Sequence, residues 1–141
     1  MTNASGRLLL FRVGGGRYAL DLHQVAEVLE PLPEYPLPWA PPYLRGVASL
    51  HGSLVCVLDL ASYLGFTSTP ADRDLIVLNL PETALALAVE GVERIIPVTD
   101  VLEEEPAAEA LTRTRLQLED GPARLMTLDP LLAAVEEALA R

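Results

Sequence analysis

The sequence is poor in the residues that build metal and redox sites. It holds one cysteine, Cys56, and two histidines, His23 and His51, and none of these forms a pair at the spacing of metal ligands. One cysteine excludes a disulfide within the chain, and Cys56 lies inside an apolar run, where a thiol is ordinarily a small core side chain. We therefore expect no metal ion, no cofactor and no need for an oxidising compartment.

Basic residues and long apolar runs are scarce too. The 10 Lys and Arg against 20 Asp and Glu give a net charge of -10, which repels phosphate backbones and predicts no nucleic-acid partner. No apolar run approaches the roughly 18 residues that a membrane-spanning helix needs. The N-terminal MTNASGRLLLF lacks a basic leader ahead of a long apolar core. We expect a cytoplasmic protein with no direct membrane insertion.

Signatures of catalysis are missing as well. The glycines at 14–16 are followed by neither a helix nor a Lys-Ser/Thr pair, so they do not form a phosphate-binding loop. A hydrolase site can be assembled on paper from His51, Ser53 and Asp59, but neighbours in a turn rarely reach the geometry of base, nucleophile and orienting carboxylate. Ser53 and Asp59 are better explained as turn and helix-cap residues. We expect no catalytic residue, and an enzyme using His51 and Asp59 is the least favoured alternative.

What the sequence does have is apolar content, at 50%, and two hairpin patterns. RLLLFRV (7–13) and RYALDL (17–22) flank the glycines and predict a first β-hairpin. GVASL and SLVCVL around His51-Gly52 predict a second. A short helix should follow, capped by Asp59 and ended by Gly65.

The segments between these hairpins and near the chain's end are less regular. HQVAEVLE (23–30) is compatible with one or two helical turns or with a strand. The six prolines of 30–46 exclude a regular ladder, and the acidic stretch 100–110 reads as a solvated connection. The final segment, 129–141, predicts a helix with Asp129 as N-cap and Pro130 at its first position. Its apolar face should comprise Leu131, Leu132, Val135 and Leu139.

The two halves of the chain repeat the same order of segments. At an offset of 67 residues, apolar positions coincide between LLLFRV and LIVLNL and between YALDLHQVAEVL and LALAVEGVERII. Near an offset of 69, the second hairpin and its Leu-Asp recur in LEDGPARLMTLDPLL. Units of roughly 65 residues with five short strands are typical of small SH3-like barrels. Such units are marginally stable alone, so the two should pack closely together.

We therefore predict a mainly β fold with an internal duplication and a C-terminal helix. The chain, 1–141, is expected to be one domain, with residues 7–66 as a first barrel unit and 72–129 as a second. The polar, proline-marked stretch 67–71 is the expected boundary.

One aromatic segment offers a candidate surface for recognition. Tyr35, Trp39 and Tyr43 lie among the prolines of 30–46 and form either a partner-docking surface or a lid over a groove between the barrels. Val25 and Leu29 either belong to the core or line that groove. We expect Trp39 to be partly exposed in the free protein and buried in a complex.

Three segments resemble the CheW family of bacterial chemotaxis coupling proteins: FRVGGGRYALDLHQVAEVLE, YLRGVASLHGSLVCVLDLASYLG and LALAVEGVERII. The resemblance covers about residues 7 to 134 and is strongest from Gly46 onward. It implies two intertwined five-stranded SH3-like barrels without a catalytic centre. It also implies a scaffold that couples methyl-accepting chemoreceptors to the regulatory domain of a CheA-type histidine kinase, at membrane-associated receptor arrays. A divergent module of a non-flagellar, for example pilus-related, chemosensory system is the alternative, and a binding module outside chemotaxis is a further one.

The resemblance places receptor-coupling positions at Val25, Glu27, Gly46, Ser49 and His51. Where the family reads Asn-Leu-Arg-Gly, this chain reads Ser-Leu-His-Gly, so an imidazole replaces a permanently charged guanidinium.

The kinase-facing surface is expected in the second half of the chain, within residues 89–96. The candidates there are Val89, Val92 and Ile95.

Overall fold

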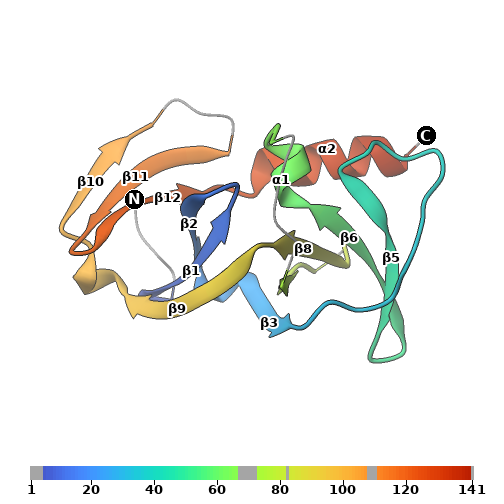
Figure 1. Ribbon diagram of the computed structural model, residues 1–141, viewed down its shortest axis with the longest axis horizontal. Coiled ribbons are helices and arrows are strands. Elements are labelled where there is room, and N and C mark those ends of the chain that lie inside the picture. Colours follow the sequence, from blue (N-terminus) through green and yellow to red (C-terminus); the bar gives the residue numbers. More distant parts are fainter. Residues whose placement is uncertain (1–4, 67–72, 82, 108–110, 141) are drawn as a thin grey trace.

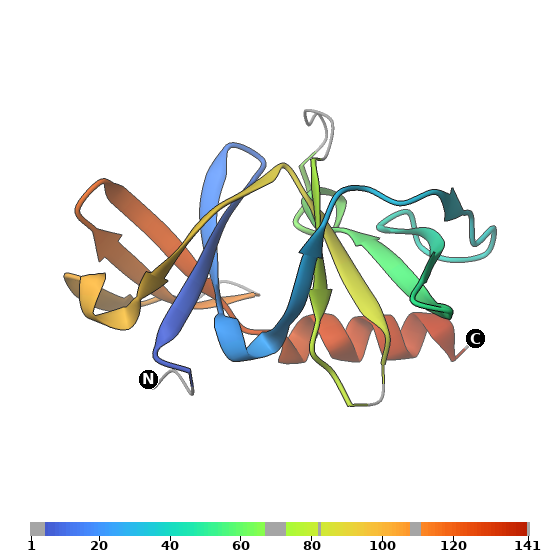
Figure 2. The ribbon, with the colours of Figure 1, turned by 90° about the horizontal axis from the view of Figure 1, so that it is seen from below.

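The computed structural model describes residues 5–66, 73–81, 83–107 and 111–140, with the backbone alone at Arg113. Two six-stranded sheets lie side by side, and a C-terminal helix runs along one of them (Figures 1 and 2). We name each sheet by one of its strands. The β1 barrel has the order β10 (Glu103–Pro106), β11 (Thr112–Leu118), β12 (Gly121–Met126), β2 (Gly16–Asp21), β1 (Arg7–Val13) and β9 (Gly91–Pro97).

The β5 barrel is built in the same way from the remaining strands. Its order is β4 (Glu34–Tyr35), β5 (Leu44–Leu50), β6 (Ser53–Asp59), β8 (Leu85–Val89), β7 (Asp74–Leu78) and β3 (Val25–Leu29). Exchanging the two halves of the sequence converts one order into the other, because β10 takes the place of β4, β11 of β5, β12 of β6, β2 of β8, β1 of β7 and β9 of β3. The predicted duplication and the intertwined, mainly β fold are therefore confirmed in the strand topology.

Each barrel takes strands from both halves of the chain. The first half gives β1 and β2 to one sheet and β3 to β6 to the other, so neither 7–66 nor 72–129 forms a barrel by itself. Parallel pairs join the halves, β12 with β2 and β6 with β8. Each sheet has six strands rather than five because the short β4 and β10 also pair. The expected boundary at 67–71 lies outside the described residues.

Burial explains why the strands read as apolar runs. In β1, Leu9 and Phe11 face a large core shared by both sheets and the C-terminal helix, while Leu8 and Leu10 face a smaller cluster inside the β1 barrel. A strand covered on both faces needs apolar residues at successive positions. The same holds for β8, whose five residues are all buried.

The helices follow the prediction with corrections at the ends. In α1 (Leu60–Tyr63), the Asp59 carboxylate accepts a hydrogen bond of 3.2 Å from the Ser62 backbone N–H, which confirms the predicted cap. In α2 (Asp129–Leu139), Leu128 is the N-cap and makes no side-chain capping bond, so the assignment to Asp129 was wrong by one residue.

The buried face of α2 differs from the predicted one at its end. It comprises Leu131, Val135 and Ala138, whereas Leu139 is 44% exposed and Leu132 only partly buried. Spacings of four and three residues keep a narrow stripe on the core, and Leu139 lies one residue farther round the helix.

The irregular segments gain more structure than expected. Residues 23–30 resolve into a 3₁₀ turn, η1 (Leu22–Gln24), followed by β3. The exclusion of a ladder from 30–46 was wrong at two places: Glu34 and Tyr35 fall between prolines and pair with β5, and Leu44–Gly46, after the last proline, already belong to β5. The stretch 100–110 is more than a connection, since it contains the end of η2 (Val98–Asp100) and the strand β10.

Candidate functional site

Two of the expected receptor-coupling residues meet at the open side of the β5 barrel. His51 and Gly52 form the two-residue turn between β5 and β6, with φ of +51° and +81°, as a type I′ turn requires. The His51 Nε2 atom lies 3.0 Å from Glu27 Oε1 and 3.3 Å from Oε2. The His51 side chain is 73% exposed and that of Glu27 36%. This pair is therefore accessible to a partner.

The contact between Glu27 and His51 joins distant parts of the sheet. Glu27 belongs to β3, at one edge, and His51 follows β5, the strand next to the opposite edge. A bulge at Ala26 interrupts the pairing of β3 with β7 just before Glu27. The pair thus forms a clasp between an edge strand and a hairpin tip.

The β1 barrel has the equivalent clasp with the charges reversed. Arg94, which lies 67 positions after Glu27, donates a hydrogen bond of 3.0 Å to Asp120 in the turn between β11 and β12. A bulge at Glu93 precedes it, as the bulge at Ala26 precedes Glu27. Arg17 also bonds Asp120, at 3.0 and 3.3 Å. His51 is the first residue of its turn and Asp120 the second, so the two contacts join corresponding pairs of elements through different turn positions and with opposite charges.

The charges of the β1 clasp reinforce one another. Hydrogen bonds from Arg17 and then Arg94 lower the pKa of the Asp120 carboxyl. Arg17 also lies 2.9 Å from Glu93, which Arg12 contacts at 3.3 Å. Desolvation opposes the charged form of Arg17, but its bonds to Asp120 and Glu93 outweigh it, and its pKa is raised. The charged forms of Arg17 and Asp120 are therefore both favoured by this network.

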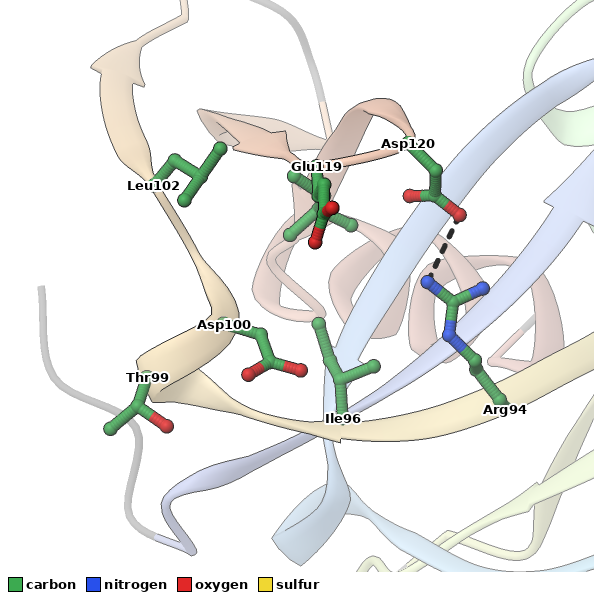
Figure 3. Close-up of a pocket in the computed structure, with 8 residues that line it drawn as sticks. Arg94, Ile96, Thr99, Asp100, Leu102, Glu119 and Asp120 are labelled. Carbon is green, nitrogen blue, oxygen red and sulfur yellow. Dashed lines mark hydrogen bonds and ion pairs between the residues drawn. The ribbon is translucent and has the colours of Figure 1, made fainter.

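A cavity of about 570 Å³ opens beside the β1 clasp (Figure 3). Its apolar lining includes Ile96 and Leu118, which belong to the interior of the β1 barrel, and Leu102, which is 68% exposed. Asp100 and Glu119 also line it. The cavity offers apolar contact together with an excess of negative charge, since three carboxylates and one guanidinium, that of Arg94, line it.

Gly46 has a structural role that the resemblance did not reveal. It is buried in β5, and a Cβ atom there would overlap the carbonyl group of Tyr35. The neighbouring Arg45 is a bulge residue whose guanidinium donates two hydrogen bonds to Glu34, at 3.1 and 2.7 Å. Gly46 therefore allows β4 to lie against β5.

The other expected receptor-coupling residues lie apart from the clasp. Val25 is partly buried against the shared core. Ser49 is exposed on the same hairpin as His51 and opposes Leu54, which is 64% exposed. Sequence reasoning missed Leu54, although its alternation with the buried Val55 was a signal for the opposite face. Leu29 packs inside the β5 barrel, as a core residue.

The aromatic segment divides into an anchor and two exposed side chains. Tyr43 is partly buried and meets Tyr63 edge to face, with ring centroids 5.0 Å apart. Tyr35 is 63% exposed and Trp39 is 74% exposed, which confirms the exposure expected of Trp39. Both rings are therefore accessible from solvent, and their role in docking a partner stays a prediction.

The expected kinase-facing residues fall into three environments. Val89 is 1% exposed and lies in the shared core, so it presents no surface to a partner and its selection was wrong. Val92 is partly buried against the same core. Ile95 is 49% exposed on β9, an edge strand of its sheet. Of the three, Ile95 is the one with an exposed side chain.

The structure separates the residues of the hydrolase alternative. His51 precedes β6 and Asp59 ends it, and seven residues of strand span about 20 Å. The Asp59 carboxylate is occupied as the cap of α1. Within the described ranges, no three His, Cys, Asp or Glu side chains gather as metal ligands, and no helix has the length and apolar character to cross a bilayer.

Comparisons with known proteins agree with this architecture. Scaffolding protein TtCheW from Thermoanaerobacter tengcongensis has the same fold, with a TM-score of 0.76 and 21% identity over 87% of this chain and 89% of that one. Chemotaxis protein CheW of Rhizobium meliloti (strain 1021) is 30% identical over 102 residues, or 71% of this chain and 66% of that protein. Protein PilI of Pseudomonas aeruginosa is 30% identical over 104 residues, or 71% of this chain and 58% of that protein.

The matches cover different shares of this chain and of its relatives. The chain spans about two thirds or less of the length of the curated relatives it matches. The profile of the family described as the CheW-like domain matches residues 7–136, nearly the whole chain. The chain therefore belongs to the CheW-like domain family.

Proposed function

We propose that this chain is a non-catalytic scaffold that couples the cytoplasmic tip of a chemoreceptor to the regulatory domain of a CheA-type histidine kinase. The observation that carries the proposal is the pair of Glu27 and His51. Both stand at positions where the family resemblance places receptor coupling, and they meet at 3.0 Å on an accessible face. Relatives named as chemotaxis proteins support the same role.

The proposal assigns the two ligands to different barrels. The receptor tip docks on the β5 barrel at Glu27, Ser49 and His51. The kinase domain docks on the β1 barrel along β9, where Ile95 supplies exposed apolar area and Val92 lies beside it. Tyr35 and Trp39 extend the docking surface of the β5 barrel. In this role the protein works in the cytoplasm at membrane-associated receptor arrays.

A second candidate function is favoured by one comparison. The similarity to a protein named PilI supports a scaffold for a non-flagellar, for example pilus-related, chemosensory system. The two candidates share the chemistry of the site and differ in which receptor and kinase bind. Parallel titrations against fragments from each system of the same genome separate them.

The test is a titration of the purified protein against a CheA-type regulatory domain, with calorimetry as the readout. Saturable one-to-one binding is the expected result. A second titration uses a helical-hairpin fragment of a chemoreceptor tip. If neither ligand from any system of the genome binds, the scaffold proposal is wrong, and the chain is a binding module of another kind.

A further inference from the structure

The two clasps differ in whether their charges can change with pH. Arg94 and Asp120 in the β1 barrel are a guanidinium and a carboxylate whose pKa is lowered, so both stay charged. In the β5 barrel the cation of the clasp is replaced by an imidazole, the one side chain whose ordinary chemistry changes its charge between pH 5 and 8. The second clasp is an ion pair only when that ring carries a proton.

Within the described residues, Glu27 is the charged side chain that contacts the His51 ring. Its own turn contributes Gly52 and Ser53, which have no charge. On neighbouring strands, Arg45 is engaged with Glu34, and the Asp59 carboxylate caps α1 at the far end of β6. Glu30, after β3, is exposed and outside the contact. Glu27 is therefore the charged group whose electrostatic energy depends on whether the His51 ring is protonated.

In the free protein, protonation of His51 has little effect on the free energy of unfolding. The His51 side chain is 73% exposed and water screens its contact with Glu27, so the pair contributes little whether it is charged or neutral. The situation changes when a partner covers the face. A carboxylate that loses water without a cation beside it is strongly destabilised, whereas a complete ion pair suffers less.

We propose that docking of a receptor tip on the β5 barrel is coupled to proton uptake by His51, so that binding tightens as pH falls from 8 to 6. This inference rests on the proposed function, because it concerns the same receptor site. The sign follows from linkage: the complex holds the protonated ring more strongly than the free protein does, so added protons favour the complex. One proton sets an upper limit of about tenfold in affinity per pH unit.

The experiment is calorimetry of a chemoreceptor-tip hairpin fragment against the full chain at pH 6, 7 and 8. Each titration is repeated in two buffers of different ionisation enthalpy, because the difference in heat counts the protons taken up. The variants are His51→Arg, which fixes the charge, and His51→Asn, which removes it and tolerates a positive φ. His23→Asn is the matched control, since His23 is the other histidine and is exposed on η1.

The expected wild-type result is an affinity about three- to tenfold weaker at pH 8 than at pH 6, with measurable proton uptake at pH 7. His23→Asn should behave in the same way. His51→Arg should bind equally well at all three pH values, and His51→Asn should bind weakly at all three, both without His51-dependent proton uptake.

The outcomes distinguish a failure of the proton coupling from a failure of the scaffold function. Wild-type binding without a pH slope, or a slope that survives in His51→Asn, overturns the proton coupling and leaves the scaffold role intact. No binding of the receptor fragment by any variant at any pH overturns the proposed function, and the coupling with it.

Discussion

Gly46 lies so close to the backbone of Tyr35 that a side chain at position 46 would occupy the space of the Tyr35 carbonyl group. The α-carbon of Pro36 is also within 3.1 Å of that position. Both obstacles are backbone atoms, which cannot swing aside as the end of a side chain can. The absence of a side chain at Gly46 therefore lets β4 lie against β5 at the edge of the sheet.

Gly46→Ala should therefore destabilise the protein by about 1–3 kcal/mol, the usual cost of forcing a methyl group into a packed region. Urea unfolding followed by circular dichroism measures the change. Gly16→Ala is the control, because a Cβ at Gly16 would meet Tyr18 at an ordinary 3.5 Å. Equal losses in the two variants would show that the approach of Tyr35 is not the cause.

The β1 clasp should make stability depend on pH in the acid range. Because hydrogen bonds from Arg17 and Arg94 lower the pKa of Asp120, its carboxylate stabilises the fold above the unfolded value of 3.8, and this contribution is lost as pH falls through the folded value. Asp120→Asn should thus unfold more easily than wild type at pH 7. The difference should shrink as pH falls below 3.8.

The control for Asp120→Asn is Asp100→Asn, since Asp100 lines the same cavity and neither arginine of the clasp bonds it. It should leave the free energy of unfolding at pH 7 unchanged. A difference between Asp120→Asn and wild type that stays constant down to pH 2 would contradict the assigned role of the carboxylate.

Local sequence patterns predicted most of the helices and strands, but not the long-range pairing between strands. The apolar runs, the glycine turns and the Asp59 cap each depend on neighbours in the chain, so the hairpins and α1 were predictable. The parallel pairing of Tyr18 with Arg124 joins residues on β2 and β12 that are far apart in sequence. No local signal specifies such a pair, because it depends on how the whole duplicated chain packs.

In the candidate site, too, residues could be predicted from the sequence but their contacts could not. The resemblance supplied Glu27 and His51, but their contact depends on the curvature of the sheet and on the bulge at Ala26. Val89 was misplaced because a strand buried on both faces and a strand with one exposed face share the same apolar letters. Ile95 is 49% exposed while its neighbour Ile96 is 4% exposed, and the two identical letters in the sequence do not say which of them faces solvent.

A charge on the exposed face of β9 should block the kinase. Ile95→Glu should weaken binding of the CheA-type regulatory domain at least tenfold, because the carboxylate would be desolvated against an apolar contact. Leu139→Glu is the matched control, since Leu139 is similarly exposed on α2. Calorimetry on both variants is the measurement, and unchanged melting temperatures verify the folds. Equal affinities would move the kinase surface away from β9.

Trp39 should report on the docking surface directly. It is the only tryptophan and is 74% exposed, so burial in a complex should shift its emission to shorter wavelength. Titrations with receptor and kinase fragments in turn show which ligand covers it. Trp39→Ala should weaken the binding of that ligand alone. A confirmed complex with unchanged emission would remove the 30–46 segment from the interface.

Restoring the family pattern at the hairpin tests whether the departure from it matters. The double substitution Ser49→Asn with His51→Arg places a permanent guanidinium beside Glu27, where it can bond both carboxylate oxygens, which the single Nε2 of His51 now meets at 3.0 and 3.3 Å. Receptor affinity at pH 8 should rise about threefold to tenfold, since a guanidinium keeps a cation beside the carboxylate at every pH, which an imidazole does not. Ser49→Asn alone, which changes no charge, should bind as wild type does. If the double variant binds no better than wild type, the imidazole is only a turn residue, and the interface is formed by other side chains of the β5 barrel.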